Sequence, residues 1–323
     1  MSPVIRRVRS LLCVVAVAMS AASALPVSAV EGDDGEFLLS CVHEVVYQPF
    51  AGIILVSVTV ADSPPLDFLL DSGATQSSVT DPFLARAIGL EARNSGLARG
   101  VGSGATRIVV AEDVSIRMDG VEVLKAPLVV HDIGTRLAAG AGREIHGFLG
   151  AELFQRYVVE IDPLDRRLLL HDPKTFEYRG RGFEVPIEVV GGRPVVEGIV
   201  EIEEVGKEVP VRLMVDTGSS RFLTLVTKSR RRLKPPPDQR VGASIGVVGE
   251  TVVSLAPTHR LRLGPIVARE LETAWLGAQD MPAVRNIEGL NGILGNRFLS
   301  RFRVIFDYRA GRLILEPIRP SPG

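Results

Sequence analysis

Short stretches in which apolar and polar residues alternate recur along the whole chain and predict β-strands. Residues 55–60 read Leu-Val-Ser-Val-Thr-Val and residues 200–203 read Val-Glu-Ile-Glu, the period-2 pattern of a half-buried strand. Residues 66–70 and 211–215 are mostly apolar, which is typical of more deeply buried strands. Two segments pair apolar runs across a turn and predict hairpins: 158–170 and 304–315. The pattern therefore predicts a mostly β fold.

Helical signals are few and short. Thr80 or Asp81 can cap a helix that has Pro82 in its first turn and ends near Gly89. Three further helical segments are expected, the last of them a basic run with a solvated face: 151–157, 296–302 and 228–234.

A single offset of 145 residues aligns two halves of the chain over more than 100 positions, with a small shift of register upstream of Pro65. A repeat of this length indicates a duplicated domain rather than a solenoid unit. Short strands with turn signals favour barrel-like or sandwich lobes. The sequence thus predicts two pseudo-symmetric β-barrel lobes, at 45–178 and 179–323.

The N-terminus has the features of a secretory signal peptide at residues 1–29. Three arginines precede an apolar stretch at 11–18, and small residues offer cleavage sites after Ala24 or Ala29. The alternative is an uncleaved membrane anchor, although the stretch is shorter than the ~20 residues that span a bilayer. Export to the periplasm or the extracellular space is expected, with a leader at 30–44.

Composition excludes several other classes of protein. The formal net charge is −1, which does not favour nucleic-acid binding. Two cysteines are too few for a disulfide-stapled scaffold or a four-cysteine zinc site. The five histidines are scattered without the spacing of metal ligands. We therefore expect no metal and no organic cofactor.

The candidate chemistry lies in one tripeptide pattern that occurs once in each repeat, directly after an apolar strand: Asp71-Ser72-Gly73 and Asp216-Thr217-Gly218. If a two-fold axis relates the repeats, the two loops meet on it and the carboxyl groups lie within hydrogen-bond reach. Two such groups cannot both ionise freely, so they share one proton, and one acts as base while the other acts as acid. The pair could then activate a water molecule to attack a peptide carbonyl.

These loops, together with Phe148-Leu149-Gly150 and Ile293-Leu294-Gly295, resemble the pepsin/retropepsin-type aspartic peptidases over residues 45–320. The likeness is greater to the two-lobed bacterial, retropepsin-like forms than to pepsin itself. The resemblance implies a catalytic dyad of Asp71 and Asp216, a hydroxyl lattice made by Ser72 and Thr217, and loops shaped by Gly73 and Gly218. It also implies mobile flaps over a cleft, for which the candidates are Gly102, Ser103 and Gly104 in the first repeat and Gly246 and Gly249 in the second.

The resemblance predicts an exported aspartic endopeptidase, a hydrolase that needs no cofactor and acts on extended peptide or protein substrates. One chain supplies both aspartates, so a monomer suffices for the dyad. Neither nucleic-acid binding nor stable membrane insertion after signal cleavage is expected. The alternative is a peptide-binding protein of the same fold without catalytic activity.

Overall fold

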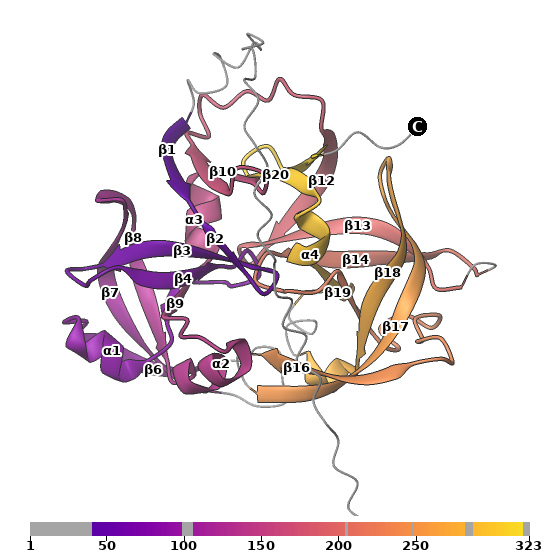
Figure 1. Ribbon diagram of the computed structural model, residues 1–323, viewed down its shortest axis with the longest axis horizontal. Helices are drawn as coiled ribbons and strands as arrows, with labels where there is room; N and C mark the ends of the chain where they lie inside the picture. The colour runs from indigo at the N-terminus through magenta and orange to yellow at the C-terminus, as the bar shows by residue number, and fades with distance from the viewer. Residues whose placement is uncertain (1–40, 99–105, 204–205, 247–248, 282–286, 319–323) are drawn as a thin grey trace, which may run out of the picture. The chain divides into compact units, whose positions relative to one another are not determined.

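The computed structural model describes residues 41–98, 106–203, 206–246, 249–281 and 287–318. They belong to one compact unit, Phe37–Gly323, whereas the predicted signal segment 1–29 lies outside the described residues. Most of the described elements are strands (Figure 1), so the prediction of a mostly β fold is confirmed. No helix among the residues placed by the structure has the length and apolar character needed to cross a membrane.

The first repeat forms a six-stranded barrel. Its strands are hydrogen-bonded in the order β3 (Ile53–Val60), β4 (Leu66–Leu70), β9 (Gly147–Leu149), β5 (Ser78–Val79), β8 (Val121–His131) and β7 (Thr106–Met118). The barrel closes because β7 pairs back with β3, with Thr59 opposite Arg117. Two strands extend this sheet beyond the ring: β2 (Gln48–Phe50) and β6 (Ala92–Ala98).

The second repeat builds the same barrel from the corresponding strands. The order is β13 (Arg193–Glu201), β14 (Val209–Asp216), β19 (Leu290–Gly295), β15 (Leu223–Val226), β18 (Ile266–Leu276) and β17 (Gly249–Leu263). Here β17 pairs back with β13, with Val200 opposite Leu261, and β16 (Arg240–Gly246) extends the edge. The two rings have the same order of strands, so the sequence repeat is a repeat of the barrel.

A six-stranded antiparallel sheet, here called the interlobe sheet, connects the two barrels. Its strands follow the order β1 (Cys41–Val46), β11 (Arg167–His171), β10 (Val158–Asp162), β20 (Phe302–Asp307), β21 (Arg312–Pro317) and β12 (Phe183–Val190). The predicted hairpins at 158–170 and 304–315 are β10–β11 and β20–β21. Strand β1 begins at Cys41, within the segment expected to be a leader. Pairing of β10 with β20 joins the repeats at their centre.

Three of the four described α-helices were expected. In α1 (Pro82–Ala87), the Asp81 side chain accepts a hydrogen bond from the Phe83 N–H, and Gly89 follows at φ +76°. Helices α3 (Ala151–Arg156) and α4 (Asn296–Leu299) follow the paired glycines as predicted. Helix α2 (Gly134–Ala141) was not predicted, and none of its residues is buried.

The predicted helix over the basic run 228–234 is wrong. These residues form turns, and Lys228 has a left-handed backbone with φ +64°. The Ser229 hydroxyl donates to the Val226 carbonyl at 2.7 Å, which competes with the hydrogen bonds of a helix. The three prolines that follow cannot supply the N–H groups that would continue a helix.

Buried aromatic rings link the first barrel to the interlobe sheet. Phe154 on α3 is fully buried and meets Phe306 on β20 edge-on, with ring centroids 5.1 Å apart. It also stacks on Tyr308 at 5.8 Å. Such contacts add to the free energy gained by burying the rings themselves.

We predict that Phe154→Ala lowers the free energy of unfolding by about 3–5 kcal/mol, because it leaves a cavity between the barrel and the sheet. Phe83→Ala is the matched control: Phe83 is 78% exposed, so its loss should change stability by no more than about 0.5 kcal/mol. Urea unfolding of both variants measures the difference. Equal losses would show that Phe154 does not connect the two parts of the core.

Candidate active site

Each Asp-containing loop leaves its barrel between two parallel strands. Strand β4 runs parallel to β9, and β14 runs parallel to β19. The Asp71 N–H donates to the Leu149 carbonyl at 2.9 Å, and Asp216 lies opposite Gly295. The apolar-apolar-Gly elements singled out in the sequence therefore lie directly beside the two aspartates.

The two loops meet, and each carboxyl group lies over the backbone of the other loop. A Cβ added at Gly73 would lie 2.7 Å from the Asp216 Cγ, and one added at Gly218 would lie 2.6 Å from the Asp71 Cγ. No side chain fits at either position, which explains why both are glycine. The two carboxyl groups therefore lie close enough to affect each other's ionisation.

Hydroxyl groups lock the two loops together by reciprocal hydrogen bonds. The Ser72 N–H donates to the Thr217 Oγ1 at 3.0 Å, and the Thr217 N–H donates to the Ser72 Oγ at 3.0 Å. The hydroxyl of Ser72 then donates to the Val215 carbonyl at 2.8 Å, and that of Thr217 to the Leu70 carbonyl at 2.7 Å. Ser72 and Thr217 are completely buried, so these four bonds form without competition from water.

Burial is the first cause that raises the pKa of Asp71 well above its ordinary value, and the negative charge and hydrogen bond of Asp216 add to it. Burial also raises the pKa of Asp216. The hydrogen bond from Asp71, the N–H groups of Gly218 and Ser219 and the positive charge of Arg193 act in the opposite direction. The environment thus favours one proton shared by the pair, because two adjacent carboxylates would repel each other.

The glycines after each apolar pair are required by close packing. A Cβ at Gly150 would lie 2.5 Å from the Gln76 carbonyl carbon, and one at Gly295 would lie 2.3 Å from the Arg221 oxygen. The segments that follow the two aspartates therefore lie against the second elements. This contact fixes the direction in which each Asp loop leaves its barrel.

Both repeats contain a hairpin at the position expected for a flap. In the first, β6 pairs with β7 from Ala92 to Ala98; the candidates Gly102, Ser103 and Gly104 lie outside the described residues. In the second, Gly246 pairs with Gly249 near the tip of the β16–β17 hairpin. Their roles in substrate binding stay predictions.

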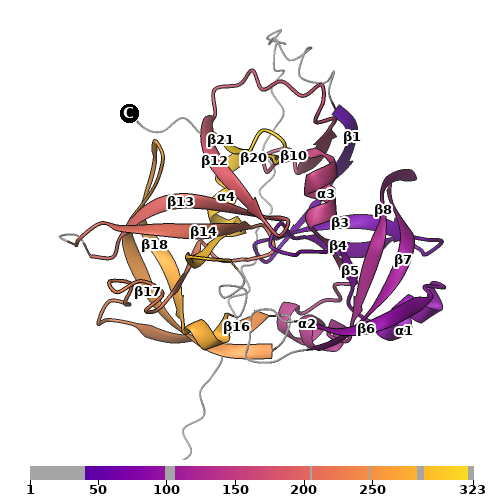
Figure 2. The ribbon, with the colours of Figure 1, turned by 180° about the vertical axis from the view of Figure 1, so that it is seen from behind.

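The second hairpin is attached to the loop that contains Asp216. The Arg221 side chain donates to the Ala243 carbonyl of β16 at 2.7 Å. Strand β16 also lies beside α2 of the first repeat, as both views show (Figures 1 and 2). This hairpin therefore reaches from its own barrel to an element of the other repeat.

Two side chains near the dyad were not singled out in the sequence. Arg193, at the start of β13, is buried with only 8% of its surface exposed, and it interacts electrostatically with Asp216. The Tyr308 hydroxyl is buried without a hydrogen-bond partner. Burial first, and then the charge of Asp71, raise the pKa of Tyr308. Neither residue belongs to the repeated motif, so the repeat gave no signal for them.

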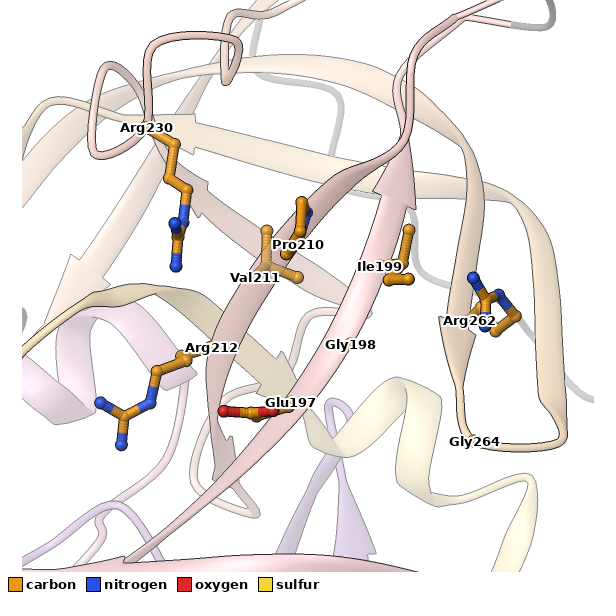
Figure 3. Close-up of a pocket in the computed structure, with 9 residues that line it drawn as sticks. All are labelled: Glu197, Gly198, Ile199, Pro210, Val211, Arg212, Arg230, Arg262 and Gly264. Atoms are coloured by element: carbon orange, nitrogen blue, oxygen red, sulfur yellow. The ribbon is translucent and has the colours of Figure 1, made fainter.

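A hollow of about 350 Å³ on the second barrel contains neither aspartate. It lies over β13 and β14 and is lined by Glu197, Gly198, Ile199, Pro210, Val211, Arg212, Arg230, Arg262 and Gly264 (Figure 3). Its arginines already have partners, such as Glu188 for Arg212 and Glu208 for Arg262. Within the described segments, no group of three or more metal-ligating side chains occurs.

Comparison with protein families identifies the first repeat. Residues 56–153 match the family model described as aspartyl protease, and this stretch includes Asp71, Ser72, Gly73 and the Phe148–Gly150 element. The resemblance to the aspartic peptidases is thereby confirmed. The second repeat lies outside the match and is related to the first by its strand order. A search of curated proteins found no match to the chain.

We predict that Thr217→Val lowers the free energy of unfolding by about 1–3 kcal/mol, because the buried Ser72 N–H and Leu70 carbonyl both lose their partner. Thr217→Ser keeps the hydroxyl and should cost less. Chemical unfolding of the two variants provides the comparison. A larger loss in Thr217→Ser than in Thr217→Val would mean that packing of the methyl group, rather than the hydrogen bonds, holds the loops.

The raised pKa of Asp71 also predicts how stability depends on pH. In the unfolded chain Asp71 ionises near its usual pKa of about 4, whereas in the folded protein it resists ionisation. The wild type therefore loses stability relative to Asp71→Asn as the pH rises above about 4, and the difference disappears below that value.

Unfolding measurements across this pH range test the prediction. Asp62→Asn, which removes the carboxyl group of an exposed aspartate in the same barrel, is the control. The assigned direction would be contradicted if the stability of the wild type relative to Asp71→Asn rose, rather than fell, as the pH increases above about 4.

Proposed function

We propose that the protein is an exported aspartic endopeptidase that hydrolyses peptide bonds with a water molecule activated by Asp71 and Asp216. The observation that carries this proposal is the close approach of the two Asp loops, in which each carboxyl group lies over the glycine of the opposite loop and reciprocal hydrogen bonds of Ser72 and Thr217 join the loops. The aspartyl-protease match over residues 56–153 supports it. Export rests on the sequence pattern of residues 1–29.

The proposed reaction follows from one proton shared by two carboxyl groups. The ionised group takes a proton from water as the water oxygen adds to the peptide carbonyl carbon. The protonated group gives its proton to the carbonyl oxygen, which forms a tetrahedral diol. In the breakdown step the newly protonated group gives its proton to the amide nitrogen as the carbon–nitrogen bond breaks, and a diol hydroxyl returns a proton to the ionised group as the product carboxylic acid forms. One carboxyl and one carboxylate are then present again, so the dyad is unchanged over the cycle.

The strand pairs β6–β7 and β16–β17 support an extended peptide as the substrate. Hairpins beside a cleft can bind a peptide backbone through strand-like hydrogen bonds and exclude water from the reacting bond. The bond between Arg221 and Ala243 connects one hairpin to the Asp216 loop. Binding of substrate under this hairpin would therefore also affect the geometry of that loop.

Asp71→Asn and Asp216→Asn should each reduce cleavage of an unfolded protein substrate by at least about 100-fold, because each variant loses one member of the acid–base pair. Pepstatin-like inhibitors should block the wild type. Asp62→Asn, an exposed aspartate in the first repeat, should cleave at the wild-type rate.

Circular dichroism of each variant separates loss of chemistry from loss of the fold. If folded Asp71→Asn and Asp216→Asn cleave as fast as wild type, the dyad is not catalytic. If the wild type binds extended peptides without cleaving them, the protein is the non-catalytic binding protein of the same fold.

A further inference from the structure

The two repeats differ in charge at one pair of equivalent positions beside the dyad. In the first barrel, the antiparallel register that places Leu55 opposite Leu69, continued by two residues, places Ile53 opposite Asp71. In the second barrel, the register that places Val195 opposite Met214 places Arg193 opposite Asp216 in the same way. On its antiparallel side each aspartate therefore faces one residue, which is apolar in the first barrel and cationic in the second.

The turns that precede these neighbours confirm that the positions correspond. Ala51 and Gly52 have φ +48° and +85°, and Gly191 and Gly192 have φ +57° and +80°. Both pairs are two-residue turns with a left-handed backbone, typical of tight hairpins. Phe50 pairs with Ile53 across the first turn, and Val190 pairs with Arg193 across the second.

Arg193 is held in a place that is unusual for a guanidinium. It is 8% exposed and its Nε is buried without a hydrogen-bond partner. Val195 and Met214, which continue the same face of the barrel, are buried apolar residues. Ile53 is 9% exposed, and its apolar neighbours account for its burial. A cation buried among apolar side chains, by contrast, is costly unless a negative charge lies near it.

Among the acidic side chains on the elements around Arg193, Asp216 is the one that faces it. On α3, which packs against the Gly192 turn, Glu152 accepts two hydrogen bonds from Ser77. The other charged group of α3, Arg156, lies over the Tyr157 ring. The other titratable groups at the dyad are Asp71 and Tyr308, and the latter interacts electrostatically with Asp71. The charge of Arg193 acts on Asp216.

We propose that Arg193 is a positioning residue that keeps Asp216 as the carboxylate of the dyad and so places the shared proton on Asp71. A positive charge beside one member of a symmetric acid pair stabilises ionisation of that member. Ile53 gives Asp71 no such help. The asymmetry of charge therefore comes from the sequence of the β12–β13 hairpin and not from the Asp loops.

The catalytic roles that follow from this assignment rest on the proposed function. Asp216 becomes the base that takes the proton from water, and Asp71 becomes the acid that protonates the carbonyl oxygen. The charge asymmetry itself can be measured on protein that is not cleaving anything, so the two proposals can fail separately.

The test uses ¹³C-labelled aspartate and NMR titration of variants that retain a single dyad carboxyl group. In Asp71→Asn, adding Arg193→Gln should raise the pKa of Asp216, and Arg193→Lys, which keeps the charge, should restore most of it. In Asp216→Asn, Arg193→Gln should move the pKa of Asp71 by clearly less. Ile53→Gln in the Asp71→Asn background is the matched control and should leave the pKa of Asp216 nearly unchanged.

Equal shifts for the two aspartates, or no shift for Asp216, would overturn the proposal. So would an equal effect of Arg193→Lys and Arg193→Gln, because the loss would then be one of shape rather than charge. If Arg193→Gln does not fold, Arg193→Met, which keeps the apolar stem, takes its place. The predicted shift at Asp216, together with a wild-type protein that cleaves no peptide, would uphold the charge asymmetry and refute the peptidase.

Discussion

The reciprocal hydrogen bonds between Ser72 and Thr217 are the constraint on which the rest of the site depends. Each backbone N–H is satisfied by the hydroxyl of the opposite loop, in a completely buried position. Separating the loops would leave several polar groups without partners, and each would cost about 1–3 kcal/mol. The spacing of the two carboxyl groups is therefore set by backbone and hydroxyl contacts beneath them and not by their own interaction, which in the ionised state would be repulsive.

The stability of the two barrels and the interlobe sheet compensates for the cost of holding two carboxyl groups close together. Two adjacent acids with raised pKa values are unfavourable at neutral pH, and the closed barrels and the interlobe sheet provide the framework that holds them. The close packing of Gly73 and Gly218 against the opposite carboxyl groups leaves no room for relaxation.

Much of this structure could be predicted from sequence because the duplication places each signal twice. The strands before Asp71 and Asp216, the two hairpins of the interlobe sheet and the helices after Gly150 and Gly295 all recur at one spacing. Helix α2 escaped prediction because none of its residues is fully buried and its apolar contacts to the core rest on short side chains and one leucine, Leu137. The helix expected over 228–234 failed because local hydrogen bonds and the left-handed Lys228 form a turn instead.

Arg193 could not be found in this way. It corresponds to Ile53 through an offset of 140 residues rather than 145, because the register of the repeat shifts upstream of the Asp strands. Only the pairing of β13 with β14 shows that it lies opposite Asp216.

The contacts of the two hairpin turns show how far the halves have diverged. The Gly52 carbonyl accepts a hydrogen bond from the Asn296 side chain at 2.9 Å, whereas Gly192 packs on the Ala151 methyl group. Two copies of the first half alone would place that carbonyl against alanine and leave it without this donor, so the halves are no longer interchangeable.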